Sequence, residues 1–217
     1  MINVVILDFD DTLCLTEEAC FKLENEIAEE MGFPLMSRNT HQKNWGLPIR
    51  KAIKDRIPGI DVTKFMEKLD RVVANYSSNG QLDSISEKNL KALDKLKNEG
   101  KKIAILTNRS LAEVRHFLQT THPLYNRVEI IYHSDNSKFL KPDPRVFDQI
   151  LTRFKTRPKE CVYVGDVIND VIVAKKAGLH FIATLESGLR TKKDFEGQDV
   201  DYFANKFTDI VGYILQH

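Results

Sequence analysis

The sequence predicts an α/β protein: a doubly wound parallel sheet with helices on both faces, joined to a second, smaller domain made only of helices. Three observations predict this class. The chain begins with an apolar run typical of a strand buried on both faces. A long section with helical patterns and no convincing strand follows. Beyond it, strand-like and helix-like segments alternate, as in a sheet built with right-handed crossovers.

The first strand covers residues 4–7, four consecutive aliphatic residues with β-branched members. It ends at a cluster of three acids, Asp8, Asp10 and Asp11. A solvated acidic turn is one interpretation of this cluster. The other follows from the fold, because open α/β sheets bind ligands at the carboxyl ends of their strands. Three like charges so close together favour a bound cation, a bound proton or both.

Residues 15–82 form the predicted helical domain, inserted directly after the first strand. Thr16 is expected to cap a helix that runs to about residue 31 and carries an apolar residue at every fourth position. Further helices are predicted at 48–56 and 62–76, and the polar stretch 77–80 is expected to be a hinge. The predicted domains are therefore 1–14 with 83–217 for the α/β core and 15–82 for the helical domain.

The alternation of strands and helices begins after the hinge. Each predicted strand is a short aliphatic or aromatic run, and most helices end near a glycine or begin at a turn residue. The predicted strands are 102–106, 128–132, 161–164, 181–184 and 201–203. The predicted helices are 86–98, 111–119, 145–154, 171–177 and 207–215.

Composition narrows the class of protein. The 217 residues carry a formal net charge of +1, with 42% hydrophobic and 29% charged residues, which is typical of a globular protein without a basic nucleic-acid face. Cys14, Cys20 and Cys161 form no paired motif, so reduced thiols are expected. We expect no signal peptide and no membrane-spanning segment. The prediction is a cytoplasmic monomer or weak homodimer that binds a small molecule, with neither nucleic acid nor membrane as partner.

Polar side chains follow four of the predicted strands, at the edge of the sheet where parallel strands end together. Carboxylates suit Mg²⁺, which prefers oxygen ligands, whereas a hydroxyl, loop amides and a lysine suit a phosphate dianion. Each residue taken singly has an ordinary structural interpretation, but the set predicts a phosphoryl-transfer site. The residues at this edge are Asp8, Asp10, Thr107, Asn108, Lys141, Asp166 and Asp170.

Four segments carry a resemblance to a known family: DFDDT at 8–12, LTN at 106–108, KPDP at 141–144 and GDVIND at 165–170. In this order they resemble the four motifs of the haloacid dehalogenase (HAD) superfamily, which has a Rossmann-like core. The helical insert after the first motif is similar to the cap of the subfamily that holds phosphoglycolate phosphatase and β-phosphoglucomutase. The resemblance covers the whole chain.

The resemblance implies a role for each residue at the strand ends. Asp8 would be the nucleophile that forms an aspartyl-phosphate, and Asp10 would protonate the leaving oxygen and then activate water. An acid at position 10 implies a phosphatase or mutase, because a halide leaving group needs no proton. The implied phosphate-binding residues are Thr107, Asn108 and Lys141. The implied cofactor is Mg²⁺, held by Asp8, the backbone carbonyl of Asp10, Asp166 and Asp170.

The chain departs from the family's pattern at three places. Asp11 stands where glycine is common and adds negative charge near an anionic substrate. Residues 15–16 are Leu-Thr where many relatives have Asp-Ser. Arg109 follows Asn108 where a smaller or different residue is common, and it is expected either to point to solvent or to meet the substrate.

Substrate contacts from the helical domain are the least defined part of the prediction. Trp45 precedes Gly46 in an expected loop, where the indole could line a crevice, but the single Trp of a small helical domain also suits its core. The candidates for substrate contact are Asn44, Trp45, Arg50 and Lys51.

The predicted function is a Mg²⁺-dependent phosphatase that hydrolyses a small phosphorylated metabolite. A phosphomutase of the β-phosphoglucomutase type is the alternative enzyme. A receiver-type signalling module is disfavoured, because in receivers the acids precede the Thr and Lys, whereas here Asp166 and Asp170 follow them. A binding protein that lost turnover is disfavoured because every expected acid is in place.

Overall fold

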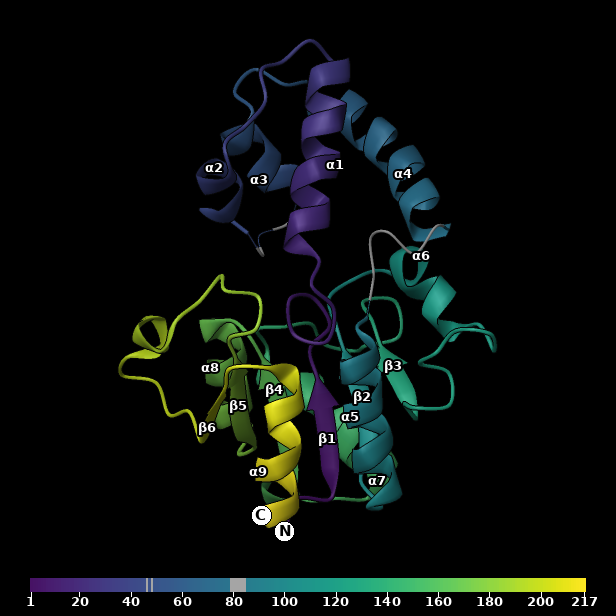
Figure 1. Ribbon diagram of the computed structural model, residues 1–217, viewed down its shortest axis with the longest axis vertical. Coiled ribbons are helices and arrows are strands. Elements are labelled where there is room, and N and C mark those ends of the chain that lie inside the picture. Colours follow the sequence, from purple (N-terminus) through teal and green to yellow (C-terminus); the bar gives the residue numbers. More distant parts are fainter. Residues whose placement is uncertain (46, 48, 79–84) are drawn as a thin grey trace. The chain divides into compact units, whose positions relative to one another are not determined.

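The computed structural model describes residues 1–45, 47, 49–78 and 85–217 (Figure 1). The chain divides into two compact units: Met1–Cys14 with Ile85–His217, here the α/β unit, and Leu15–Ser84, here the helical unit. The predicted domain boundary at residues 82 and 83 lies outside the described residues, as do the last two residues of the predicted hinge at 77–80.

The α/β unit contains one parallel sheet, whose strands lie in the order β3-β2-β1-β4-β5-β6 (Figure 1). The strand order reverses direction between β1 and β4, and the crevice at such a switch point is where sheets of this kind bind ligands. The predicted fold class is confirmed. The strands are β1 (Val4–Leu7), β2 (Lys102–Leu106), β3 (Ile130–Tyr132), β4 (Cys161–Gly165), β5 (His180–Thr184) and β6 (Tyr202–Ala204).

Helices cover both faces of the sheet because alternate residues of each strand point to opposite sides. Val5 and Leu7 of β1 pack in a core with α5 and α9, while Val4 and Ile6 pack in a second core with α7 and α8 (Figure 1). Burial on both faces explains the unbroken aliphatic run of β1. The helices of this unit are α5 (Glu87–Asn98), α6 (Leu111–Val114), α7 (Asp148–Phe154), α8 (Ile168–Lys176) and α9 (Ile210–Gln216).

Four predicted elements of the α/β unit are shorter or less regular than expected. The helix predicted at 207–215 begins as a 3₁₀ helix at Phe207–Asp209 before α9. The helix predicted at 111–119 is the single α-turn of α6 followed by a 3₁₀ helix at Arg115–Leu118. The helix predicted at 145–154 begins as a 3₁₀ helix at Pro144–Phe147 before α7, because proline suits a first turn but donates no hydrogen bond. The strand predicted at 128–132 begins only at Ile130, where pairing with β2 starts.

The helical unit packs α1 (Glu17–Glu30), α3 (Ile49–Arg56) and α4 (Val62–Ser78) around one apolar core. Leu23 and Ile27, on the predicted apolar face of α1, are buried in it. Thr16 precedes α1 as expected, but its side chain does not make the predicted capping hydrogen bond. Within the part of the chain that the structure describes, no helix is long and apolar enough to cross a membrane.

A short polar helix, α2 (Arg38–Gln42), was not predicted because it shows no apolar repeat. It carries His41, which is buried between two acids of α1: its Nδ1 lies 2.8 Å from Glu17 Oε1 and its Nε2 3.3 Å from Glu24 Oε1. Arg56 of α3 donates to both oxygens of Glu24, at 2.6 and 2.8 Å. These buried charges are paired with one another, as burial requires.

Candidate active site

The candidate site lies at the carboxyl ends of β2, β1 and β4, which are neighbours in the sheet. Leu7 of β1 is in register with Ile105 of β2 and Val164 of β4. The residues that follow these strands therefore emerge together at one edge. The structure thus places Asp8, Thr107 and Asp166 at that edge, although they are far apart in the sequence.

Three buried carboxylates meet there. One oxygen each from Asp8, Asp166 and Asp170 lies within 4.8 Å of the other two, and all three residues are buried. Asp170 belongs to the first turn of α8 and packs against the backbone of Gly165. A Cβ at position 165 would lie 2.5 Å from Asp170 Oδ2, so only glycine leaves room for this carboxylate. Gly165 opens the GDVIND segment at 165–170, whose resemblance to a family motif implied no role for it.

Lys141 is the cation of this cluster. Its Nζ donates to Asp8 Oδ1 at 2.8 Å and to Asp170 Oδ1 at 3.1 Å, and it lies 2.9 Å from the hydroxyl of Tyr163. The Tyr163 hydroxyl donates to Asp170 Oδ1 at 3.0 Å. The sequence predicts Tyr163 only as a strand residue, but a hydroxyl within a buried strand is a signal that the side chain has a polar partner.

Asn108 holds the loop that carries Lys141. Its Oδ1 accepts from the Lys141 backbone N–H at 3.1 Å, and its Nδ2 donates to the Lys141 carbonyl oxygen at 3.0 Å. Two reciprocal hydrogen bonds fix the loop to the end of β2. The side-chain amide of Asn108 therefore positions Lys141, and any contact of Asn108 with phosphate stays a prediction.

The electrostatics of the cluster are dominated by burial. Burial, opposed by Lys141 and assisted by the charge of Asp170, raises the pKa of Asp8 to about 7. Burial and the charge of Asp8 hold the pKa of Asp166 well above its usual range. Burial works to lower the pKa of Lys141, but Asp170 and Asp8 outweigh it and raise the pKa well above the usual value. The cluster holds more carboxylates than cations, which favours a further cation.

The donor set fits a hard divalent cation. Asp170 Oδ2 is buried and has no hydrogen-bond partner among the described residues, although buried carboxylate oxygens normally have one. Three carboxylate oxygens within 4.8 Å of one another are ligands of the kind that Mg²⁺ prefers. The group that could hold an ion consists of Asp8, Asp166 and Asp170, and the Asp10 carboxylate has another partner.

Asp10 forms a two-point ion pair with Arg109. The Arg109 Nε lies 3.1 Å from Asp10 Oδ2, and its Nη2 lies 2.6 Å from Asp10 Oδ1. The guanidinium also lies over the ring of Phe9, with Cζ 4.9 Å from the ring centroid, and the Arg109 backbone N–H donates to Thr107 Oγ1 at 3.2 Å. The Arg109 side chain is only 11% exposed, so the alternative that it points to solvent is wrong, whereas contact with the substrate stays a prediction.

Asp11, one of the departures from the family's pattern, lies in the turn after β1. Asp11 has a φ of 53°, in the left-handed region that favours glycine but that Asp adopts more readily than most residues. Its backbone N–H donates to the Cys14 carbonyl oxygen at 2.6 Å. Thr12 Oγ1 donates to Asp166 Oδ1 at 3.4 Å. Thr12 therefore links this turn to the acid cluster.

The four candidates in the helical unit divide into two pairs. Asn44 Oδ1 accepts from Arg56 Nε at 2.7 Å, and the Trp45 ring lies 5.0 Å from that of His41, so both residues belong to the polar network of this unit. Arg50 and Lys51 are exposed on α3. Substrate contact by Asn44, Trp45, Arg50 or Lys51 stays a prediction.

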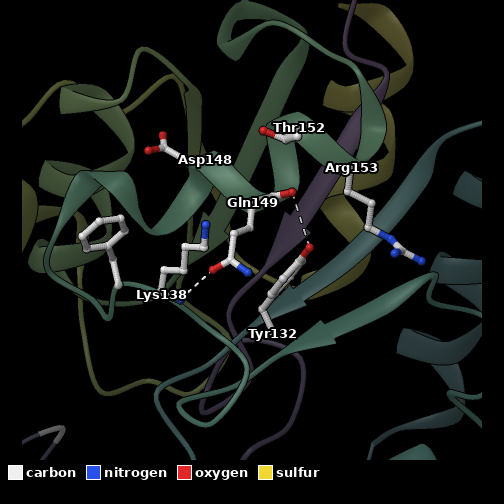
Figure 2. A pocket seen from close by; sticks show the side chains of 7 residues that line it. Tyr132, Lys138, Asp148, Gln149, Thr152 and Arg153 are labelled. Atoms are coloured by element: carbon white, nitrogen blue, oxygen red, sulfur yellow. Dashed lines mark hydrogen bonds between the residues drawn. The ribbon is translucent and has the colours of Figure 1, made fainter.

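A cavity of about 490 Å³ lies elsewhere on the α/β unit, between β3 and α7. Figure 2 shows Gln149 between Lys138 and Tyr132: its Oε1 accepts from the Lys138 backbone N–H at 2.6 Å, and its carbonyl oxygen from the Tyr132 hydroxyl at 3.4 Å. None of the acids at the strand ends lines this cavity. The buried, charge-coupled cluster at the strand ends is the better candidate for chemistry.

Open α/β sheets bind their ligands at the switch point. Buried acids gathered there are typical of α/β enzymes that act on small molecules. The family model of haloacid dehalogenase-like hydrolases matches residues 5–184, and the chain belongs to this family. The predicted resemblance is confirmed, and the chain is therefore a hydrolase by family.

Individual proteins that are similar to this chain include phosphatases. The chain is 26% identical over 185 residues to a phosphoglycolate phosphatase from Nitrosospira multiformis, covering 82% of this chain and 81% of that one. It is 24% identical to the pyrophosphatase PpaX from Bacillus mycoides, covering 97% and 95%. CbbY from Rhodobacter sphaeroides, solved in complex with phosphate, shares the fold with a TM-score of 0.74 at 21% identity, covering 97% of this chain and 96% of that chain.

Proposed function

We propose that this chain is a Mg²⁺-dependent phosphatase that hydrolyses a small phosphorylated metabolite through an aspartyl-phosphate on Asp8. The observation that carries the proposal is the position of Asp8, which is buried at the end of β1 between Lys141 and the acids Asp166 and Asp170. A carboxylate held next to both a cation and a divalent-ion site is suited to attack a phosphate ester, whose own charge would otherwise repel it.

Two displacements at phosphorus make up the reaction. In the first, an Asp8 oxygen bonds to phosphorus while the ester P–O bond breaks, and Asp10 gives a proton to the leaving oxygen. In the second, Asp10 takes a proton from water, the water oxygen bonds to phosphorus, and the Asp8–phosphorus bond breaks. Inorganic phosphate leaves and both acids return to their starting states. Thr107, the Asn108 backbone and Lys141 hold the phosphoryl oxygens throughout.

Mg²⁺ would be held by Asp8, the backbone carbonyl of Asp10, Asp166 and Asp170. When bound, it supplies positive charge beside the phosphoryl oxygens. The free Oδ2 of Asp170 and the surplus of buried carboxylates support this assignment. Lys141 then remains with Asp8 to neutralise charge as the phosphoryl group arrives.

The relatives support a small phosphorylated molecule as the substrate. The relatives named above include a phosphoglycolate phosphatase and a pyrophosphatase, and both names describe small phosphorylated substrates. The near-zero net charge gives no support for nucleic acid as substrate. A cytoplasmic location and a monomeric or weakly dimeric state are part of the same proposal.

Phosphate release from a panel of phosphate esters tests the proposal. Purified protein with Mg²⁺ is expected to release phosphate from at least one small ester without an added bisphosphate, and EDTA should abolish this release. The Asp10→Asn variant should lose about 100-fold or more of the rate with alkyl esters, whose leaving groups need a proton. Isomerisation of a sugar phosphate that requires a bisphosphate activator would instead identify a mutase. Absence of any release across the panel would contradict both enzymes.

A further inference from the structure

The ion pair between Arg109 and Asp10 conflicts with the role proposed for Asp10. Both Asp10 oxygens accept hydrogen bonds from one guanidinium, at 2.6 and 3.1 Å. The Asp10 side chain is 35% exposed at the rim of the site, whereas that of Arg109 is 11% exposed and stacked over Phe9. A carboxyl group that hands a proton to a leaving oxygen cannot keep both oxygens on a guanidinium. The pair therefore has to open during the reaction.

Opening the pair is unfavourable unless another anion replaces Asp10. Arg109 would give up two charge-assisted hydrogen bonds from a poorly solvated position. The position of Arg109 is fixed, because its backbone N–H donates a hydrogen bond to Thr107 Oγ1 and its guanidinium lies over the Phe9 ring. The guanidinium is thus held beside the phosphate-binding end of β2, on the side of the site that Asp10 occupies.

We propose that Arg109 is a specificity-determining residue that selects phosphate esters whose leaving group carries a second anionic group, a carboxylate or a phosphate. This inference rests on the proposed function and names the substrate class of the same site. The second anion replaces Asp10 on the guanidinium and accepts the same two hydrogen bonds, because the planar guanidinium of arginine binds carboxylate and phosphate with the same geometry. Asp10 is released to the leaving oxygen. A neutral leaving group offers no such replacement.

The two cations of the site, Lys141 and Arg109, bind different groups. Lys141 is buried among Asp8, Asp170 and Tyr163 and faces the phosphoryl group that is transferred. Arg109 binds the acid that serves the leaving group. Substitution of Arg109 should therefore change the choice among leaving groups more than the affinity for the phosphoryl group.

Three esters that differ only in the second anion test the inference. Glycerol 3-phosphate has a neutral leaving group, 3-phosphoglycerate replaces its terminal alcohol by a carboxylate, and glycerol 1,3-bisphosphate replaces it by a phosphate. We expect wild-type kcat/KM to favour the two acidic esters by about tenfold or more, because a site built for a polar group rejects analogues that lack it. The Arg109→Met variant should lose this preference, because kcat/KM for the two acidic esters falls relative to kcat/KM for glycerol 3-phosphate.

Control variants separate charge from geometry. Arg109→Lys keeps the charge without the fork, so an intermediate preference is expected. Arg115→Met removes an equal charge from an exposed position on the following 3₁₀ helix and should keep the wild-type preference. A fall in kcat/KM by the same factor for all three esters in Arg109→Met would contradict the inference, as would equal wild-type rates on the three.

A binding measurement distinguishes failure of this inference from failure of the proposed function. Asp8→Asn removes turnover, so binding can be measured without hydrolysis. The same esters are titrated calorimetrically into the Asp8→Asn variant and into the Asp8→Asn, Arg109→Met double variant. Tighter binding of the acidic esters by about tenfold, lost in the double variant, supports the inference even if the wild-type protein hydrolyses none of them. Equal affinities for the three esters in Asp8→Asn would overturn it even if hydrolysis is observed.

Discussion

The ammonium nitrogen of Lys141 lies 2.8 Å from Asp8 Oδ1, although the two residues are 133 positions apart in the sequence. The contact is largely excluded from solvent, with side-chain exposures of 13% for Lys141 and 10% for Asp8. In such surroundings a charge interaction is strong, and loss of one partner leaves the other uncompensated.

Lys141→Met is therefore expected to lower both stability and activity. Asp8 and Asp170 would lose their shared cation, which should cost about 3–5 kcal/mol in the free energy of unfolding. Phosphate release should fall by about 100-fold or more, because a preorganised charge is lost. Urea denaturation and steady-state assays measure the two effects. Lys138→Met, an exposed lysine three residues earlier, serves as control. Equal behaviour of the two variants would contradict the role of Lys141.

Mg²⁺ is expected to raise the melting temperature. A ligand present at about 100 times its Kd stabilises the folded state by about 2.7 kcal/mol, provided that it does not bind the unfolded chain. The increase should be absent in Asp166→Asn and Asp170→Asn, which each remove one carboxylate of the cluster. Differential scanning calorimetry with Mg²⁺ and with EDTA measures it. An unchanged melting temperature in wild-type protein would contradict the assignment of the metal site.

The stability of metal-free protein should fall as pH rises from about 4 to about 7. Burial raises the pKa of Asp8 from 3.8 to about 7, so between these values the folded state binds a proton that the unfolded state has released. The derivative of the unfolding free energy with pH is then negative for this group. The Asp8→Asn variant should show a flatter profile than wild type in EDTA. A steeper or unchanged profile in urea unfolding curves would contradict this.

Gly165→Ala tests the packing of the acid cluster. The added Cβ would lie 2.5 Å from Asp170 Oδ2, and forcing atoms into a packed site costs about 1–3 kcal/mol. Activity should fall with it, because Asp170 is displaced. Gly212→Ala in α9, where nothing lies within 4 Å of the added Cβ, is the matched control and should stabilise by about 0.5–1 kcal/mol. A harmless Gly165→Ala would show that Asp170 can move without consequence.

The fold could be predicted from sequence because each strand carries its own signal. A buried parallel strand is a short aliphatic run, and β1, β2 and β4 are such runs followed at once by polar residues. Parallel pairing then fixes which polar residues share an edge. Asp8, Thr107 and Asp166 could be placed together on this basis without knowledge of any side-chain contact.

Contacts between side chains could not be predicted in the same way. The ion pair of Arg109 with Asp10 and the contact of Tyr163 with Lys141 join residues from different elements, and they depend on rotamers and on loop geometry that leave no periodic signal. Helix ends were similarly uncertain: the residues of α6 and the 3₁₀ helix after it follow one pattern, and tertiary packing decides where the α-helix ends.

The central claim, that Asp8 carries the phosphoryl group, is tested most directly by trapping the acyl phosphate. Protein with Mg²⁺ and p-nitrophenyl phosphate is treated with borohydride, which reduces an aspartyl-phosphate to homoserine, and the residue is located by peptide mass spectrometry. We expect homoserine at position 8 in wild-type protein, and more of it in Asp10→Asn, which cannot activate water. Asp8→Asn should show none. Phosphate release at the wild-type rate by Asp8→Asn, or a reduced residue elsewhere, would contradict the mechanism.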